Sequence, residues 1–372
     1  MSILKCGCFG IGNAGGQITS LAHKNFGFKA LCANVSSADL EVLEGVDTIL
    51  IGDGMGSGKD RNLAKKYAKE NIKSLISKDV FSEFINDLQV VFVITSVAGG
   101  SGGGMGPLTT DVLSNVYPDT IFIYVGVLPA YKESLRSQRN TLECLKEIVD
   151  IQIPYMLYDN NRVKDSISVT DAMTKVNHAI VEDLCILRGD HNLLSTVGMV
   201  DGRELHTLLS TPGLINVTSA VGFKEKDLDQ VGVEDLLIKN LGTTLSCEFD
   251  RNRAIEYMCT IVNLTKDIDN KFDKTLPKFK EVVGEPEATF DHYYEIKPEE
   301  TERFANRVHV ISAGLGVPDD RLKRIVERID EADRLKKSAK SSSILDNYEK
   351  VIKDERKVNT DIDLDDILNK YN

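Results

Sequence analysis

The sequence predicts an α/β fold in which a mostly parallel sheet carries helices on both faces. Two observations lead to this prediction. Residues 1–160 alternate short apolar runs with amphipathic helical patterns, as βαβ units do. A long helical pattern at 170–189 then precedes a second, smaller block of mixed α and β character. The length of 372 residues suits two compact domains, or one large domain with extensions.

The first block contains apolar runs of strand length separated by helical patterns. We expect strands at Ile3–Phe9, Ala30–Ala33, Val90–Val97, Ile121–Leu128 and Pro154–Tyr158. We expect helices near Gln17–Asn25, Asp60–Ser77 and Lys132–Val149. In sheets of this kind, ligands bind beyond the carboxyl ends of the strands, so a functional site is expected in the loops that follow them.

The second block starts after one long predicted helix, 170–189, which Gly189 ends. Apolar runs predict the strands of a smaller α+β domain at Leu214–Val221, Ile255–Val262 and Val308–Ala313. A further helix is expected after Pro318, through Arg334 and beyond. From about Lys336 the chain is polar and highly charged.

Composition narrows the function classes. Hydrophobic residues make up 42% and charged residues 27%, which argues against global disorder. The chain lacks a run of about 18 apolar residues and a recognisable signal peptide, so no membrane association is expected. Seven cysteines without a CxxC pair favour buried thiols in a reducing compartment, hence a cytoplasmic location. The net charge of −12 disfavours direct nucleic-acid binding, and the histidines show no metal-ligand spacing.

The first glycine-rich loop, residues 10–17, reads Gly-Ile-Gly-Asn-Ala-Gly-Gly-Gln and joins a predicted strand to a predicted helix. Glycines let the backbone approach an anion, and the helix N-terminus offers N–H groups and a positive dipole. The same loop fits the GxGxxG pattern of NAD-binding folds, so it does not by itself separate one nucleotide from another.

The second loop, residues 98–106, reads Ala-Gly-Gly-Ser-Gly-Gly-Gly-Met-Gly and again lies between a strand and a helix. It predicts a second phosphate-binding turn. It is not a Walker A loop, because it contains no Gly-Lys-Ser/Thr, and a Rossmann dehydrogenase needs no second loop of this kind.

A third glycine cluster, residues 52–59, ends in Ser57-Gly58-Lys59. A Walker A interpretation fails here, because Lys59 is followed by Asp60 and because Asp53 stands where the motif needs glycine. Backbone amides of this cluster, including that of Gly54, could instead contact the outermost phosphate.

Residues 98–104 resemble the signature of the tubulin/FtsZ superfamily, with Ser101 in place of its threonine. Residues 12–17 resemble the first nucleotide loop of that family, and Asn34 falls in a segment similar to the second. Residues 306–316 resemble the last FtsZ strand and its glycine turn. The resemblance covers about residues 3–330. The third loop and the charged tail look most like those of the plasmid- and phage-encoded TubZ and PhuZ branches.

The resemblance also implies how a guanine nucleotide is held. Glu133 corresponds to the glutamate that contacts the ribose, while Asn160 and Asn177 correspond to the residues that recognise guanine. Met173 stands where the family has an aromatic residue stacked on the base. The implied nucleotide-binding residues are Gly12, Asn13, Ala14, Gly15, Gly16, Gln17, Asn34, Gly54, Ala98, Gly99, Gly100, Ser101, Gly102, Gly103, Gly104, Glu133, Asn160 and Asn177.

The implied function is that of a polymerising GTPase. GTP or GDP would bind with Mg²⁺ held mainly by the phosphates, and head-to-tail stacking of subunits would build filaments that move or position DNA or phage cargo. The expected division is a GTP-binding domain (1–169), a central helix and catalytic loop (170–202), an activation domain (203–330), and a C-terminal helix with an acidic tail (331–372).

Hydrolysis in this family uses carboxylates that the neighbouring subunit supplies to orient the attacking water. Two segments compete for this role. Residues 212–217 resemble the FtsZ segment that precedes the catalytic loop. However, Thr218 and Val221 then occupy the positions where FtsZ has acidic residues. We prefer Asp201 and Glu204, which follow the long helix and precede a helical pattern at 204–210, and we interpret 212–217 as the next strand. The alternative role for both carboxylates is that of first-turn residues favoured by a helix dipole.

Three hypotheses follow. The first is the polymerising GTPase, the second an NAD(P)-binding Rossmann oxidoreductase, and the third a nucleotide-dependent scaffold that assembles without hydrolysis. The acidic end, residues 360–368, alternates aspartates with isoleucine and leucine. We expect it to contact the next subunit or to bind a basic, DNA-binding adaptor. The alternative is a disordered, solubilising tail.

Overall fold

The computed structural model describes residues 4–163, 168–189, 202–228, 232–243, 245–249, 255–302 and 304–341. The chain forms two compact units, Met1–Lys323 and Arg324–Asn372. Helix α12 (Asp319–Ser341) begins at the end of the first unit and provides the described part of the second. The expected helix after Pro318 is therefore present, whereas the acidic tail lies outside the described residues.

The first unit is built on one sheet with the strand order β3-β2-β1-β4-β5-β6-β7-β10-β8-β9. Its strands are β1 (Cys6–Ile11), β2 (Lys29–Asn34), β3 (Asp47–Leu50), β4 (Val90–Ser96), β5 (Ile121–Leu128), β6 (Pro154–Asp159), β7 (Gly213–Val221), β8 (Ile255–Thr265), β9 (Pro286–Ile296) and β10 (Arg307–Leu315). Strands β3 to β7 pair in parallel, while β10 is antiparallel to both of its neighbours. The order of the first six strands is that of a doubly wound α/β sheet.

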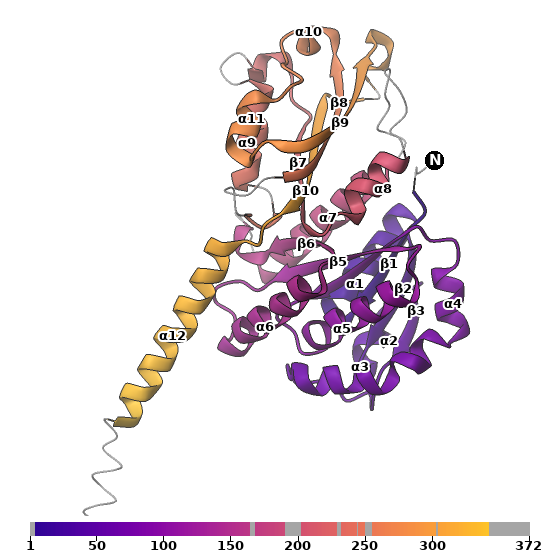
Figure 1. Ribbon diagram of the computed structural model, residues 1–372, viewed down its shortest axis with the longest axis vertical. Helices are drawn as coiled ribbons and strands as arrows, with labels where there is room; N and C mark the ends of the chain where they lie inside the picture. Colours follow the sequence, from indigo (N-terminus) through magenta and orange to yellow (C-terminus); the bar gives the residue numbers. More distant parts are fainter. Residues whose placement is uncertain are drawn as a thin grey trace, which may run out of the picture. The chain divides into compact units, whose positions relative to one another are not determined.

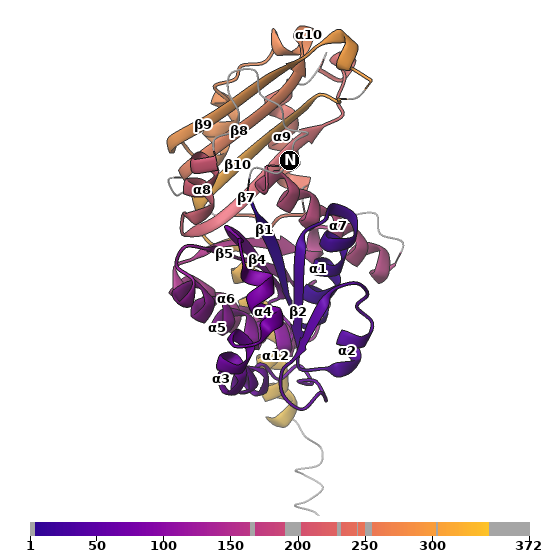
Figure 2. The same cartoon turned by 90° about the vertical axis from the view of Figure 1, so that its right-hand side faces the viewer.

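Helices cover both faces of the parallel part of the sheet. The helices of the first unit are α1 (Gly12–Phe26), α2 (Ser37–Glu41), α3 (Arg61–Ile76), α4 (Asp79–Ile85), α5 (Ser101–Val116), α6 (Leu135–Ile151), α7 (Val169–Leu187), α8 (Gly202–Ser210), α9 (Val233–Thr243), α10 (Lys266–Asp269) and α11 (Pro277–Val283). Figure 2 shows α1 and α7 on one side of β1, β2 and β4, and α3, α5 and α6 on the other. The predicted α/β architecture is confirmed.

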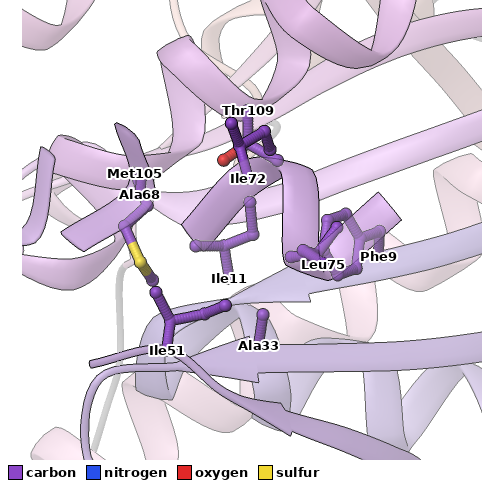
Figure 3. Close-up of a pocket in the computed structure, with 9 residues that line it drawn as sticks. All are labelled: Phe9, Ile11, Ala33, Ile51, Ala68, Ile72, Leu75, Met105 and Thr109. Carbon is purple, nitrogen blue, oxygen red and sulfur yellow. The ribbon is translucent and has the colours of Figure 1, made fainter. Parts of the chain in front are cut away.

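The layer between the sheet and the helices α3 and α5 is a filled apolar core (Figure 3). Its facing side chains are Phe9, Ile11, Ala33, Ile51, Ala68, Ile72, Leu75, Met105 and Thr109. The gap between them is about 10 Å³, which is room for one water at most. This layer therefore supports the strand ends and holds no ligand.

The parallel part of the sheet meets the remaining strands at a narrow seam between β6 and β7. Only the pairs Pro154–Gly213 and Tyr155–Leu214 join these two strands. The predicted long helix is α7, which Figure 1 shows beside the same seam. Its buried residues Val176, Ile180 and Leu184 recur every four positions and form one apolar face. Among the described residues, no helix is long and apolar enough to cross a bilayer.

Candidate functional site

A pocket of about 420 Å³ lies where the chain leaves β1 and β4. These strands are hydrogen-bonded neighbours, and the helices that follow them, α1 and α5, lie on opposite faces of the sheet (Figure 2). This is the topological switch point, where doubly wound sheets bind ligands. The pocket is lined by Ile11, Gly12, Asn13, Ala14, Ser57, Lys59, Ser96, Ala98, Gly99, Gly100, Ser101, Gly102, Glu133, Ser137 and Met173. The first two glycine-rich loops therefore share one site because their strands are adjacent.

Two helix N-termini point into this pocket without a side-chain cap of their own. The N-cap residue of α1 is Ile11 and that of α5 is Gly100, and neither provides a side-chain acceptor. The first N–H groups of a helix have no intrahelical partner and carry a partial positive charge. A bound anion would satisfy both sets, which is how helix N-termini hold phosphate.

Glycine is required where the loops touch one another. Gly12 has φ of 76°, a left-handed conformation that side chains rarely adopt. A Cβ added there would lie 3.0 Å from the amide nitrogen of Gly102, in the other loop. A Cβ on Gly100 would lie 2.1 Å from the Ser57 hydroxyl. The loops therefore approach this closely only because positions 12 and 100 carry no side chain.

Four further glycines of these motifs serve helix packing and do not line the pocket. A Cβ on Gly15 would lie 2.0 Å from the carbonyl oxygen of Ile94, and one on Gly104 would lie 2.3 Å from that of Arg61. At Gly103 the nearest atom is another backbone carbonyl, and at Gly16 it is a leucine side chain. These residues let α1 and α5 approach their neighbours closely.

Other expected contacts are engaged in local structure. The Asn34 amide is buried: its oxygen accepts from the Val35 N–H, and its nitrogen donates to Asp39. The Gly54 carbonyl accepts from both the backbone and the hydroxyl of Ser37. The Gln17 amide donates to Asn13, which does line the pocket. The sequence interpretation named Gly54 in the third loop, whereas the residues of that loop on the pocket wall are Ser57 and Lys59.

Glu133 and Met173 also line the pocket. The Glu133 carboxylate also accepts a hydrogen bond from the Ala130 N–H. Asn177 lies one helical turn after Met173 on α7, so the two residues share a face. Asn160 begins a short 3₁₀ turn directly after β6. Neither asparagine is part of the pocket wall described above.

Of the two expected catalytic carboxylates, Asp201 lies outside the described residues. Glu204 is in the first turn of α8, and its Oε2 lies 3.1 Å from Nε2 of the buried His292 on β9. The competing segment is strand β7, as expected, and Thr218 is buried inside it. Residues 212–217 therefore do not form the exposed loop that would carry a catalytic acid.

Within the described part of the chain, no group of three His, Cys, Asp or Glu side chains is placed to hold a metal ion. The described pocket wall contains one carboxylate, that of Glu133, and one ammonium group, that of Lys59. The remaining polar groups are hydroxyls, an amide and backbone N–H groups. This donor set suits a phosphorylated ligand better than a bare cation.

Comparison with known proteins defines the class. Residues 5–168 match the model of the Tubulin/FtsZ family, GTPase domain. This part of the chain is thus a tubulin/FtsZ GTPase domain.

Two groups of tubulin-like proteins are homologues of the chain. The TubZ protein of Clostridium botulinum C phage is 27% identical over 97% of both chains. The CetZ protein of Pyrococcus abyssi is 28% identical over 60% of this chain and 62% of its own length. The matches to the CetZ relatives from Pyrococcus therefore span less than two thirds of those proteins.

Solved structures show the same fold. The crystal structure of Clostridium botulinum phage c-st TubZ superposes with a TM-score of 0.70 at 23% identity, over 89% of this chain and 99% of that one. The protofilament of Bacillus thuringiensis TubZ in its GTPγS form gives a TM-score of 0.72 at 16% identity, over 92% and 95% of the two chains.

Proposed function

We propose that this protein is a GTP-dependent polymerising GTPase that assembles head to tail into filaments. One observation carries the proposal: two uncapped helix N-termini converge on a single pocket inside a tubulin/FtsZ GTPase domain. The helix N-termini would bind the phosphates. Glu133 would contact the ribose, and Asn160 and Asn177 would recognise guanine from the side of Met173.

The composition of the pocket supports hydrolysis across a subunit contact. Among its described residues the wall contains one carboxylate, Glu133, and that group is expected to bind ribose. A water-orienting acid must therefore come from elsewhere. Glu204 and Asp201 follow the long helix, and Glu204 is on α8, which is not part of the pocket wall. A neighbouring subunit stacked on the pocket would bring them to the nucleotide.

Self-association has support from the relatives. The CetZ2 protein of Haloferax volcanii is known as a GTPγS-bound protofilament, and Bacillus thuringiensis TubZ as a two-stranded filament. A head-to-tail contact uses two different faces of one subunit and does not close, so it generates filaments. Mg²⁺ would be held mainly by the phosphates, because the described residues offer no carboxylate cluster for it.

The cargo is proposed to be DNA or a phage particle, held through a basic adaptor that binds the acidic residues 360–368. The same segment could instead contact the next subunit, and the test is truncation after Thr360. An unchanged critical concentration together with loss of adaptor binding supports the adaptor role. A raised critical concentration supports the filament contact.

Sedimentation and phosphate release with GTP, ATP and NAD test the function as a whole. We expect pelleting and phosphate release with GTP alone. Assembly without phosphate release would support a non-hydrolysing scaffold. Binding of NAD without assembly would support an oxidoreductase, and an equal response to GTP and ATP would overturn the guanine assignment.

A further inference from the structure

Lys59 carries the one positive charge on the pocket wall, as far as that wall is described. Its loop does not match the Walker A motif, and none of the roles assigned above uses the lysine. A nucleoside triphosphate brings about four negative charges, and N–H groups of helix N-termini offer only partial positive charge against them. The full charge of Lys59 should therefore contribute most to the dependence of affinity on the number of phosphates.

The backbone of Lys59 is fixed against the second glycine-rich loop. The side-chain amide of Asn140 donates to the carbonyl oxygens of Lys59, at 3.1 Å, and of Ala98, at 3.2 Å. Asn140 is buried, so this bridge is shielded from water. Lys59 also has φ of 61°, a costly conformation for a residue with a side chain. Its surroundings therefore hold it in place.

The residue after Lys59 satisfies the start of the next helix. Asp60 caps helix α3 and accepts hydrogen bonds from the N–H groups of Asn62 and Leu63. The N-terminus of α3 is thus satisfied by its own carboxylate. In contrast to α1 and α5, this helix has no need of a ligand, and Lys59 and Ser57 are what the third loop presents to the pocket.

The ammonium group of Lys59 is held in place by a neutral partner. Its Nζ donates to the hydroxyl of Ser137 at 3.2 Å, and Ser137 is buried in the first turn of α6. An ammonium group has three N–H donors, so one such bond leaves two for a ligand. A hydroxyl partner also leaves the positive charge uncompensated, whereas a carboxylate would neutralise it.

The two ends of the pocket lie on opposite faces of the sheet. Met173 comes from α7, which lies on the side of α1, whereas Lys59 precedes α3 and contacts α6 on the other side (Figure 2). If the base binds beside α7, as proposed above, the phosphates extend toward Lys59. The inner phosphates then meet the N-termini of α1 and α5, and the last phosphate meets the lysine.

We propose that Lys59 binds the terminal phosphate of a nucleoside triphosphate and so makes this pocket distinguish triphosphate from diphosphate. The inference rests on the proposed function, because it takes the base to bind beside α7. It assigns the third loop a charged side chain as its ligand group, in addition to any contact from backbone amides.

The test compares binding of GDP and of GTPγS to Lys59→Met by titration calorimetry, below the protein concentration at which filaments form. Methionine is unbranched and one atom shorter than lysine, and it keeps the backbone constraint of a non-glycine residue but removes the charge. We expect GTPγS affinity to fall about 10- to 100-fold, the range of a hydrogen bond to a charged group. GDP affinity should change less than about threefold.

Lys66→Met is the matched control, because Lys66 is an exposed lysine on α3 outside the pocket. It should change neither affinity. An equal loss for both nucleotides in Lys59→Met, or no loss for either, would overturn the inference. Wild-type protein that binds neither nucleotide would instead overturn the proposed function. Circular dichroism establishes that each variant is folded, and if Lys59→Met does not fold, the same two titrations with Lys59→Gln decide.

Discussion

Arg321 and Asp159 form a buried ion pair in which the guanidinium Nε donates to the carboxylate Oδ2 at 2.7 Å. The two residues are 162 positions apart in the sequence. The same guanidinium donates to the carbonyl oxygen of Pro129, and it lies over the ring of Tyr131. One side chain at the start of α12 thereby fixes the end of β6 and the loop that leads to Glu133.

Removing one partner of this pair should be costly. Arg321→Met leaves the Asp159 carboxylate buried without its cation, and such changes destabilise proteins by about 3–5 kcal/mol. Denaturant unfolding should show a loss of this size. The double variant Arg321→Met with Asp159→Asn should recover part of it, because no charge is then left unpaired. Lys323→Met, which breaks an exposed ion pair, should cost less than about 1 kcal/mol.

Asp183 gives the protein an unusual dependence of stability on pH. Asp183 is on α7 and lines a cavity of about 260 Å³. Burial raises the pKa of its carboxyl group from 3.8 to about 7. The hydrogen bond from Tyr158 opposes this shift, and the charge of Glu182 adds to it. An acid with a raised folded-state pKa stabilises the protein fully below its unfolded-state pKa, and this contribution is lost as the pH rises through 7.

Asp183→Asn should remove this dependence, since asparagine is neutral and can still accept the hydrogen bond from Tyr158. Between pH 5 and pH 8, the free energy of unfolding of the variant should gain roughly 1–3 kcal/mol relative to wild type. Chemical denaturation at a series of pH values measures it. Glu41→Gln, at an exposed position, should keep the wild-type profile. A pH-independent difference for Asp183→Asn would contradict the shifted pKa.

Glu204→Gln tests the proposed catalytic carboxylate. Glutamine preserves the size of the side chain beside His292 but cannot act as a base, so phosphate release at saturating GTP should fall by about 100-fold. GTP binding should be retained, and filaments should persist longer in sedimentation. Glu281→Gln, at an exposed position on α11, is the control. Normal turnover in Glu204→Gln would transfer the proposed role to Glu225 and Asp227.

Gly103→Ala and Gly99→Ala test which glycine of the second loop is required for packing. A Cβ on Gly103 would lie 2.6 Å from the carbonyl oxygen of Val97, so this variant should lose about 1–3 kcal/mol of stability through overpacking. A Cβ on Gly99 would lie 3.7 Å from its nearest neighbour, an ordinary contact, on the pocket wall. Gly99→Ala should therefore keep its melting temperature. Equal melting temperatures for the two variants would contradict this division.

The apolar pattern of the sequence predicted the interior of the sheet well and its edges poorly. Run Ile121–Leu128 is strand β5 residue for residue, because a central parallel strand is buried on both faces. The strands β3 and β9 were missed. They lie at the two ends of the strand order, and most of their residues are partly or fully exposed. Edge strands need no continuous apolar run, so periodicity cannot find them.

The site was predictable where the backbone itself forms it. Gly12 and Gly100 lie at the contacts between loops, and glycine is a visible signal for such contacts. Lys59, Ser57 and Ser137 were not identified as site residues, because their role depends on loops from β3, β4 and β5 meeting in space. The sequence predicted that a helix starts at Asp60. It did not predict that the lysine before this cap lines a pocket.

The uncapped starts of α1 and α5 have a practical consequence for handling the protein. Sulfate or phosphate in a storage buffer would occupy the same backbone N–H groups, raise the melting temperature of the nucleotide-free protein and compete weakly with added nucleotide. Preparations in chloride buffers should exchange amide hydrogens fastest at the first turns of these two helices. The choice of counter-ion thus becomes an experimental variable.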